Sequence, residues 1–432
     1  MEVRVSEMFY KTILITRVDN RITINIEVAS CFYICHPPLM ETLKKNLSFD
    51  NTEIAFAYKS DKELRKSNFL FKLINNNTLV NIGTRLTPLA FKMHLPIKAI
   101  VKSTIYDHFC GGENLNESLQ VIAKLSKFNV GTILDYGVEG KESDEDFDHA
   151  TDEFVTAIKF SGANKNIPFL SLKVTGIARF ALLEKLTTTV TLTEPETVEW
   201  NRVKGRMHRI CKCAHDNGKS MMIDAEETWI QKPVDDLVEE MSRFYNKERA
   251  VVYNTIQHYR HDRLAFLKSS LEKAKRENYL LAVKLVRGAY MEKERARAAK
   301  MNYPSPINAD KTATDTDYNT GVTFCLQNIN SISVCVASHN EKSNMLAAKF
   351  LIENGMPHNH SHVHFSQLLG MSDHITFNLA HDGFNVTKYV PYGPVKDVVP
   401  YLMRRAQENT SVSGQMGREL SLLKKEMARR KK

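Results

Sequence analysis

The chain between residues 130 and 389 alternates short apolar runs with longer segments of helical periodicity. Each run is rich in β-branched or other apolar residues and closes on a polar residue. The eight runs span residues 130–135, 169–173, 221–224, 251–257, 280–285, 334–339, 363–368 and 386–389. Strands and helices in alternation are typical of parallel strands joined by crossovers, and eight strands predict closure into a barrel. We therefore expect an α/β fold of the (β/α)8 TIM-barrel type over residues 130–412.

Three further segments flank this pattern. Residues 1–46 read as a leader of doubtful order, and we expect the functional chain to begin near Met40. Residues 47–129 predict a helical region, in which Leu115, Leu119, Ile122 and Leu125 recur at the spacing of one helix face. Residues 413–432 form a basic tail, whose last nine positions hold six lysines and arginines. Such a tail favours contact with anionic surfaces.

Two stretches allow more than one interpretation. Apolar residues at positions 86–101 are interleaved with lysine and arginine, and we favour a core helix over contact with a membrane surface. The acidic run at positions 142–153 predicts either a solvated loop or the start of a helix.

The composition excludes several classes of protein. The chain has 432 residues, of which 43% are hydrophobic, so it can bury a large core. No segment has the length of a transmembrane helix. Seven scattered cysteines without a CxxC pair predict reduced thiols and no structural zinc.

Four histidines at positions 358, 360, 362 and 364 make a metal site conceivable. We favour a loop that enters a strand, because no cysteine or carboxylate completes such a site.

Polar side chains stand at or near the C-terminal ends of the expected strands, where barrels bind ligands. They are Asp135, Lys173, Asp224, Gln257, Lys284, Arg287, His339, Gln367 and Tyr389. This cationic and hydrogen-bonding set favours a phosphate-bearing ligand or a negatively charged electron acceptor over hydrolysis by paired carboxylates. Lys173 and Lys284 would also suit a Schiff-base enzyme. No GxGxxG or GxxxxGK[ST] motif indicates a Rossmann unit or a P-loop.

The last expected helix, residues 398–408, carries Arg404 and Arg405. Adjacent helical residues point about 100° apart, so the pair can hold a ligand from two sides. An arginine fork matches a carboxylate in a two-bond geometry. Taken by itself, however, the pattern favours a surface salt bridge between Arg404 and Glu408.

These stretches together resemble the proline dehydrogenase (proline oxidase) family, and most closely its stand-alone, eukaryotic-type branch. The resemblance extends from about residue 47 to residue 430, and it is carried by FLSLKVTG, MMIDAEE, NTIQHY, KLVRGAYMEKERARA, DKTATDTDYN, VASHN, FSQLLGM, KYVPYGPV and YLMRRAQEN. It implies a distorted barrel with the last helix over its mouth and FAD bound non-covalently at the strand ends. It also implies oxidation of L-proline to Δ1-pyrroline-5-carboxylate, with hydride transfer from ring C5 to flavin N5 and electrons passed to a membrane quinone.

The resemblance also implies roles for single residues. Arg404 and Arg405 would bind the proline carboxylate from two sides. Lys173 would add a third positive charge, and Asp224 would hold Lys173 in place. Glu139 would pair with one of the two arginines when the mouth closes. The residues expected to wall the pyrrolidine ring are Tyr290, Leu368 and Tyr389.

The remaining matched residues would hold the cofactor. Lys284 stands where the family places a base beside flavin N5, a position that many members fill with arginine, and we expect it to act in catalysis together with Asp224. Other expected cofactor contacts are Gln257, Arg287, Gly288, Ala289, Lys311, Thr314, Ala337, Ser338, His339 and Gln367.

Two other classes of function stay open, a Schiff-base lyase and a membrane- or nucleic-acid-binding module that uses the basic tail. We expect L-proline and a quinone as partners, peripheral membrane contact and no nucleic acid. Glu2, Glu7 and Asp19 argue against a mitochondrial presequence. We therefore expect a cytoplasmic protein peripheral to the inner membrane, with the mitochondrial inner membrane or matrix as the alternative.

Overall fold

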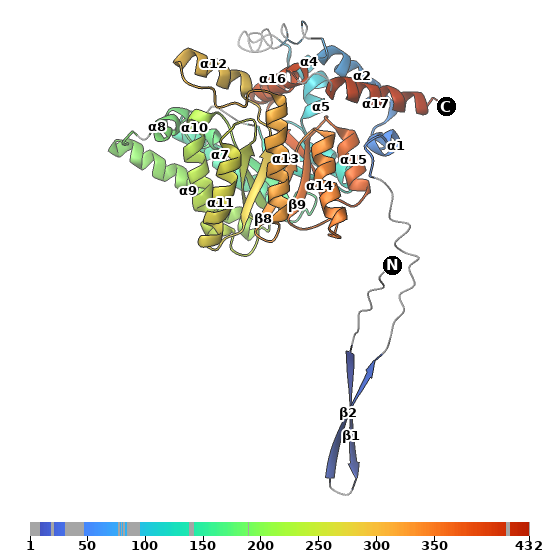
Figure 1. Cartoon of the computed structure of the whole chain (residues 1–432). Helices are drawn as coiled ribbons and strands as arrows, with labels where there is room; N and C mark the ends of the chain where they lie inside the picture. The colour runs from blue at the N-terminus through green and yellow to red at the C-terminus, as the bar shows by residue number, and fades with distance from the viewer. Residues whose placement is uncertain are drawn as a thin grey trace. The chain divides into compact units, whose positions relative to one another are not determined.

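The computed structural model describes residues 9–18, 21–30, 47–76, 78, 80, 83, 96–137, 142–188, 190–411 and 415–431 (Figure 1). The chain divides into two compact units, Met1–Asn46 and Leu47–Lys432. In the first unit, β1 (Phe9–Val18) pairs with β2 (Arg21–Ser30) in antiparallel fashion. The expected start of the functional chain at Met40 lies outside the described residues. Among the residues described, no helix combines the length and the apolar character needed to cross a bilayer.

The second unit contains a closed barrel of eight parallel strands. They are β3 (Val130–Tyr136), β4 (Phe169–Lys173), β5 (Ser220–Asp224), β6 (Val252–Gln257), β7 (Leu281–Val286), β8 (Ile332–Ala337), β9 (Val363–Leu368) and β10 (Val386–Tyr392). They follow one another around the barrel in chain order, and β10 closes the ring on β3. The predicted (β/α)8 barrel and its eight strands are therefore confirmed. Two expected strand ends are wrong: His339 lies just beyond the end of β8, and Tyr389 lies within β10, which continues to Tyr392.

Helices fill the connections and surround the strands (Figure 1). They are α7 (Asp144–Gly162), α8 (Phe180–Thr187), α9 (Glu194–Asp216), α10 (Thr228–Tyr245), α11 (Arg263–Arg276), α12 (Met291–Met301), α13 (Lys311–Gln327), α14 (Glu341–Glu353), α15 (Asp373–His381) and α16 (Val395–Ser411). The acidic run is the start of α7, where the Ser143 side chain accepts a hydrogen bond from the Asp146 N–H at 3.1 Å. Carboxylates in this first turn also suit the positive end of the helix dipole.

Side chains from alternate strands meet inside the barrel. The rings of Phe169 on β4 and Tyr253 on β6 contact edge to face, with centroids 5.5 Å apart. The Tyr253 hydroxyl and the Ser333 hydroxyl on β8 are 2.7 Å apart. Because β4, β6 and β8 are not neighbours in the ring, these contacts must cross the interior. The barrel is thus a packed core with its ligand-binding capacity at the strand ends.

Short helices precede the barrel, as the sequence predicts. They are α1 (Thr52–Phe56), α2 (Asp61–Ile74), α4 (Lys98–Val101), α5 (Asp107–Phe109) and α6 (Leu115–Ser126), with a π-helical turn at Lys102–Tyr106. Ile122 and Leu125 of α6 are buried as expected, but Leu119 is 40% exposed, so the expected apolar face is partly wrong. Ser118 faces inward instead. Gly111 lies so close to it that only a small side chain fits at this position. Most of the apolar stretch at positions 86–101 lies outside the described residues.

The basic C-terminal segment forms a packed helix, α17 (Gln415–Arg429). Leu422 and Leu423 are buried. Arg430 donates to the carbonyl oxygens of Phe56 at 2.9 Å and Lys59 at 2.8 Å. Apolar packing and these backbone contacts fix the segment against α1 and α2 (Figure 1).

A buried ionic cluster ties the N-terminal helices to the barrel. Lys59 and Lys388, from the start of the unit and from β10, each place their ammonium 3.0 Å from a different oxygen of Asp373 on α15. The Tyr58 hydroxyl donates to the same carboxylate at 2.6 Å. Burial alone would raise the pKa of Asp373, but the two ammonium groups hold it well below its usual range. The carboxylate therefore stays ionised and balances positive charge that is otherwise costly to bury.

We expect Asp373→Ala to lower the free energy of unfolding by about 3 to 5 kcal/mol, because it leaves two buried ammonium groups unpaired. Urea unfolding followed by circular dichroism measures the change. Asp236→Ala is the matched control, since its ion pair with Lys232 is exposed and should contribute less than about 1 kcal/mol. Equal losses in both variants would contradict the assignment of Asp373 as a structural centre.

Candidate active site

The carboxylate of Asp224, at the end of β5, contacts side chains from three other strands. Lys284 on β7 forms an ion pair with Oδ1, and Lys173 at the end of β4 lies 3.7 Å from Oδ2. The Tyr389 hydroxyl on β10 donates a hydrogen bond to Oδ2 at 2.8 Å. Three predicted site residues therefore meet at the carboxylate of a fourth, at the carboxyl end of the barrel.

Opposing effects set the protonation of this Asp224 cluster. Burial would raise the pKa of Asp224, but the ammonium groups of Lys284 and Lys173 bring it down to about 2. Burial raises the pKa of Tyr389 well above its ordinary value, and the charges of Asp135 and Asp224 add to the rise. At neutral pH the cluster thus presents an ionised carboxylate and a protonated phenol. The ammonium groups of Lys173 and Lys284 share the one carboxylate of Asp224.

Ser171 is a member of the cluster that sequence reasoning missed. Its hydroxyl lies 2.8 Å from Asp224 Oδ1 and 3.1 Å from the Met222 carbonyl oxygen. Alternation along β4 places Ser171 on the same face as Lys173. The sequence feature that could have identified Ser171 is its hydroxyl within the otherwise apolar run before Lys173.

Arg287, directly after β7, is held by four side chains. Its Nε donates to Asp315 at 2.7 Å, Nη1 to the Ser338 hydroxyl at 2.8 Å, and Nη2 to the Ser343 hydroxyl at 3.0 Å. The guanidinium also lies 4.3 Å from the centroid of the Tyr318 ring. The predicted residues Arg287 and Ser338 thus come together, and Asp315 and Ser343 complete the group. Neither of the latter two followed from strand position.

The turn after Arg287 requires a glycine. Gly288 has φ +134°, and a Cβ at this position would lie 2.5 Å from ring atoms of Tyr259. The Tyr259 N–H donates to the Arg287 carbonyl at 2.7 Å, which keeps the two segments close. The chain then passes Ala289 to Tyr290, which is buried and precedes α12.

Gln257 and Gln367 are buried and oriented by the protein itself. The Gln257 amide donates to the Glu226 carbonyl at 3.1 Å. The Gln367 amide donates to the Ser338 carbonyl at 3.2 Å, and its oxygen accepts from the Thr376 hydroxyl at 2.7 Å. These bonds fix both amide groups at the strand ends.

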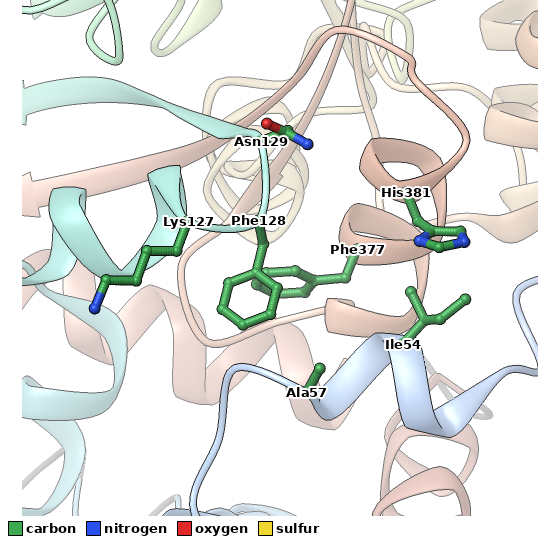
Figure 2. A pocket seen from close by; sticks show the side chains of 7 residues that line it. All are labelled: Ile54, Ala57, Lys127, Phe128, Asn129, Phe377 and His381. Atoms are coloured by element: carbon green, nitrogen blue, oxygen red, sulfur yellow. The ribbon is translucent and has the colours of Figure 1, made fainter.

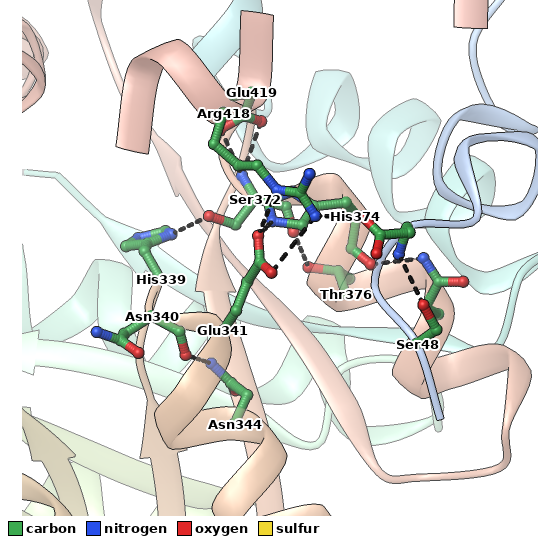
Figure 3. Close-up of polar contacts among 12 residues, drawn as sticks. Ser48, His339, Asn340, Glu341, Asn344, Ser372, His374, Thr376, Arg418 and Glu419 are labelled. Carbon is green, nitrogen blue, oxygen red and sulfur yellow. Dashed lines mark hydrogen bonds and ion pairs between the residues drawn. The ribbon is translucent and has the colours of Figure 1, made fainter. Parts of the chain in front are cut away.

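His339 follows Ser338 and lies against the turn before α15. Its Nδ1 is 2.9 Å from the Ser372 hydroxyl (Figure 3). Burial lowers the pKa of His339 to about 3, and the positive charges of Lys388 and Arg405 add to the effect. The imidazole is therefore neutral at physiological pH.

Helix α16 brings the two adjacent arginines to the mouth. The Arg404 guanidinium lies 5.8 Å from the centroid of the Tyr290 ring, just beyond β7. Arg405 is buried. Glu139, an expected partner of this pair, lies outside the described residues, as does the side chain of Glu408.

The other predicted residues surround these groups. Leu368 ends β9 and pairs in register with Tyr389. Ala337 ends β8. At the start of α13, Lys311 lies 2.5 Å from the second oxygen of Asp315, and the Thr314 hydroxyl donates to a carbonyl of its own helix. Lys311 is thereby linked to Arg287 through a shared carboxylate.

The histidine run is bound to backbone groups. His358 Nδ1 lies 2.6 Å from the Asp382 carbonyl, and His362 Nδ1 lies 2.7 Å from the Ile329 carbonyl. Over the described part of the chain, no three histidines, cysteines or carboxylates are arranged to hold a metal ion.

A cavity of about 310 Å³ lies at the other end of the barrel (Figure 2). Its lining residues are Ile54, Ala57, Lys127, Phe128, Asn129, Phe377 and His381. Asn129 directly precedes β3, so the cavity is at the amino ends of the strands. None of the predicted site residues lines it.

Comparison with known proteins indicates one family. The proline dehydrogenase family model matches residues 118–418. The carbapenem antibiotics biosynthesis protein CarD of Pectobacterium carotovorum is 35% identical over 76% of this chain and 85% of that protein. A mitochondrial proline dehydrogenase 1 of Dictyostelium discoideum is 31% identical over 91% of this chain and 77% of that protein.

Solved structures share the fold. Proline utilization A from Bdellovibrio bacteriovorus, inactivated by N-propargylglycine, superposes with a TM-score of 0.66 over 84% of this chain at 20% identity. The present chain spans 38% of that larger chain. The structural likeness supports the barrel fold, while the family model and the relatives show the family. The chain therefore belongs to the proline dehydrogenase family, as its resemblance predicted.

Proposed function

We propose that this protein oxidises L-proline to Δ1-pyrroline-5-carboxylate, with FAD as cofactor and a membrane quinone as the electron acceptor. The observation that carries the proposal is the Asp224 cluster, in which one carboxylate on β5 holds side chains from three other strands. Family membership supplies the substrate class. In the reaction, C5 loses a hydrogen with its electron pair, the ring nitrogen loses a proton, and a C5–N double bond forms.

The donor set at the strand ends fits a flavin dinucleotide. Arg287 and Lys311 supply positive charge on either side of Asp315, which suits a pyrophosphate group. The buried amides of Gln257 and Gln367 are fixed in orientation, as contacts to a planar hydrogen-bonding ring require. When bound, the flavin would supply the two-electron acceptor, with its reactive edge near Lys284.

The substrate roles follow from charge and shape. Arg405 and Arg404 would bind the proline carboxylate, with Lys173 as a third cation. Asp224 holds Lys173 and Lys284 in place and orients the Tyr389 hydroxyl, so that the Tyr389 ring is fixed as a wall of the substrate site. Tyr290 and Leu368 would complete that wall.

Lys284 would act through its charge. Its ammonium lies 5.5 Å from the centroid of the Tyr389 ring and pairs with Asp224. A fixed cation beside the acceptor stabilises negative charge where that charge develops. The same ion pair argues against the Schiff-base alternative, because an ammonium held by a carboxylate is not a free nucleophile.

The packing of α17 argues against a binding module built on a free basic tail, since Arg429 and Arg430 are bonded to Glu426. For location, several relatives are named mitochondrial proline dehydrogenases, which favours the mitochondrial alternative over a cytoplasmic protein. We therefore propose a mitochondrial location with peripheral membrane contact.

Anaerobic addition of L-proline to the FAD-loaded protein should bleach the flavin absorbance band near its visible maximum. Absorbance spectroscopy during a titration measures the reduction. D-proline is the control, because it presents the carboxylate on the wrong face of the ring. A protein that cannot be loaded with FAD, or a flavin that proline does not reduce, would contradict the proposal.

Arg405→Met should raise the KM for proline about 10- to 100-fold, the effect of losing charge-assisted hydrogen bonds to a carboxylate. Bound FAD should be retained. Steady-state kinetics with an artificial electron acceptor measures KM, and Arg202→Met on α9, whose exposed side chain pairs with Asp144, is the control. An unchanged KM would remove Arg405 from the substrate site.

Lys284→Met should slow flavin reduction by about 100-fold, because the fixed charge is lost. Lys284→Arg should keep most of the rate of flavin reduction, because it keeps the positive charge. Anaerobic stopped-flow absorbance measures both rates. If Lys284→Met reduces at the wild-type rate, the charge of Lys284 has no part in the reaction.

A further inference from the structure

The C-terminal helix α17 places a buried carboxylate beside the predicted cofactor residues. Glu419 is 3% exposed. Its two oxygens accept the Ser372 N–H at 2.9 and 3.1 Å (Figure 3). Ser372 in turn contacts His339, which follows β8. A helix outside the eight strand–helix units is thus connected to the mouth through two hydrogen-bonded contacts.

Ser372 is held in a conformation that serine rarely adopts. Its φ is +53° and its ψ is +42°, in the left-handed region that favours glycine. Every polar group of the residue is used, since its carbonyl accepts the N–H groups of Ile375 and Thr376 at the start of α15. The Glu419 carboxylate satisfies the remaining N–H. It thereby stabilises the strained backbone and the position of the hydroxyl.

The Ser372 hydroxyl in turn orients the imidazole of His339. The contact of 2.9 Å is to Nδ1, so Nε2 points away from Ser372. A hydrogen bond to one ring nitrogen fixes the orientation of the ring. Because burial keeps this imidazole neutral, it can serve a ligand through the direction of its hydrogen bonds and not through charge.

We propose that Glu419 and Ser372 are positioning residues for His339, so that α17 helps to form the cofactor site. This inference rests on the proposed function, in which His339 contacts FAD. Glu419 touches neither substrate nor cofactor in this role. It acts by fixing the turn at Ser372, which fixes the ring.

Glu426 offers a matched control within the same helix. It is also fully buried, but it bonds to Arg429 and Arg430 instead of the Ser372 turn. Glu419→Met and Glu426→Met therefore remove comparable buried carboxylates from α17. Only the first should affect His339.

The test measures the FAD dissociation constant by flavin fluorescence and Tm by thermal unfolding. Glu419→Met and Ser372→Ala should each weaken FAD binding about tenfold, as expected for the loss of one buried hydrogen bond. The double variant should be little worse than either, because both act on one path. Glu419→Gln should restore binding to within about threefold, since its amide oxygen still accepts the Ser372 N–H.

Glu426→Met should lower Tm while leaving the FAD dissociation constant within about twofold of wild type. The inference is overturned if Ser372→Ala binds FAD as wild type does, or if Glu426→Met weakens binding as much as Glu419→Met. If Glu419→Met does not fold, the FAD dissociation constants of Ser372→Ala and Glu419→Gln still test the inference. A wild-type protein that binds no FAD would instead overturn the proposed function.

Discussion

The carboxylate of Asp224, whose side chain is 14% exposed, lies among two ammonium groups and a phenol, and the barrel must close correctly for these groups to meet. Tyr389 stands 165 positions after Asp224, on the strand that completes the ring against β3. Burying a charge without its partner costs several kcal/mol, so an arrangement of strands that separated these groups would be strongly disfavoured. Closure of the barrel and assembly of the candidate site are therefore one structural requirement.

A second buried carboxylate, Asp373, attaches the rest of the unit to this barrel. It joins Lys59 near the start of the unit to Lys388 on the last strand. Lys388 is the neighbour of Tyr389, and the two side chains point to opposite faces of β10. Strand β10 thus carries Tyr389 of the Asp224 cluster and Lys388 of the ionic cluster around Asp373. This strand links the helices that precede the barrel to the candidate site.

The candidate site is built largely from strand ends, and this explains why much of it was predictable. Lys173, Asp224, Lys284 and Tyr389 follow from the position of polar residues in apolar runs. The arginines of α16 are different, since periodicity alone favoured a surface pair for them, and the resemblance reassigned them. In the structure Arg405 is buried and Arg404 approaches Tyr290. Lysine at position 284 pairs directly with Asp224.

The sequence by itself determined the eight strands, their order and the side chains at their ends, because alternation and helical periodicity are local and repeat many times. Only the tertiary structure decided the inward position of Ser118, the membership of Ser171, and the contact of Glu419 with Ser372 across 47 positions. Tyr58 meets Asp373 across 315 positions. A local pattern reports which way a residue faces within its own element, whereas such contacts depend on how distant elements pack, and no short-range periodicity encodes that.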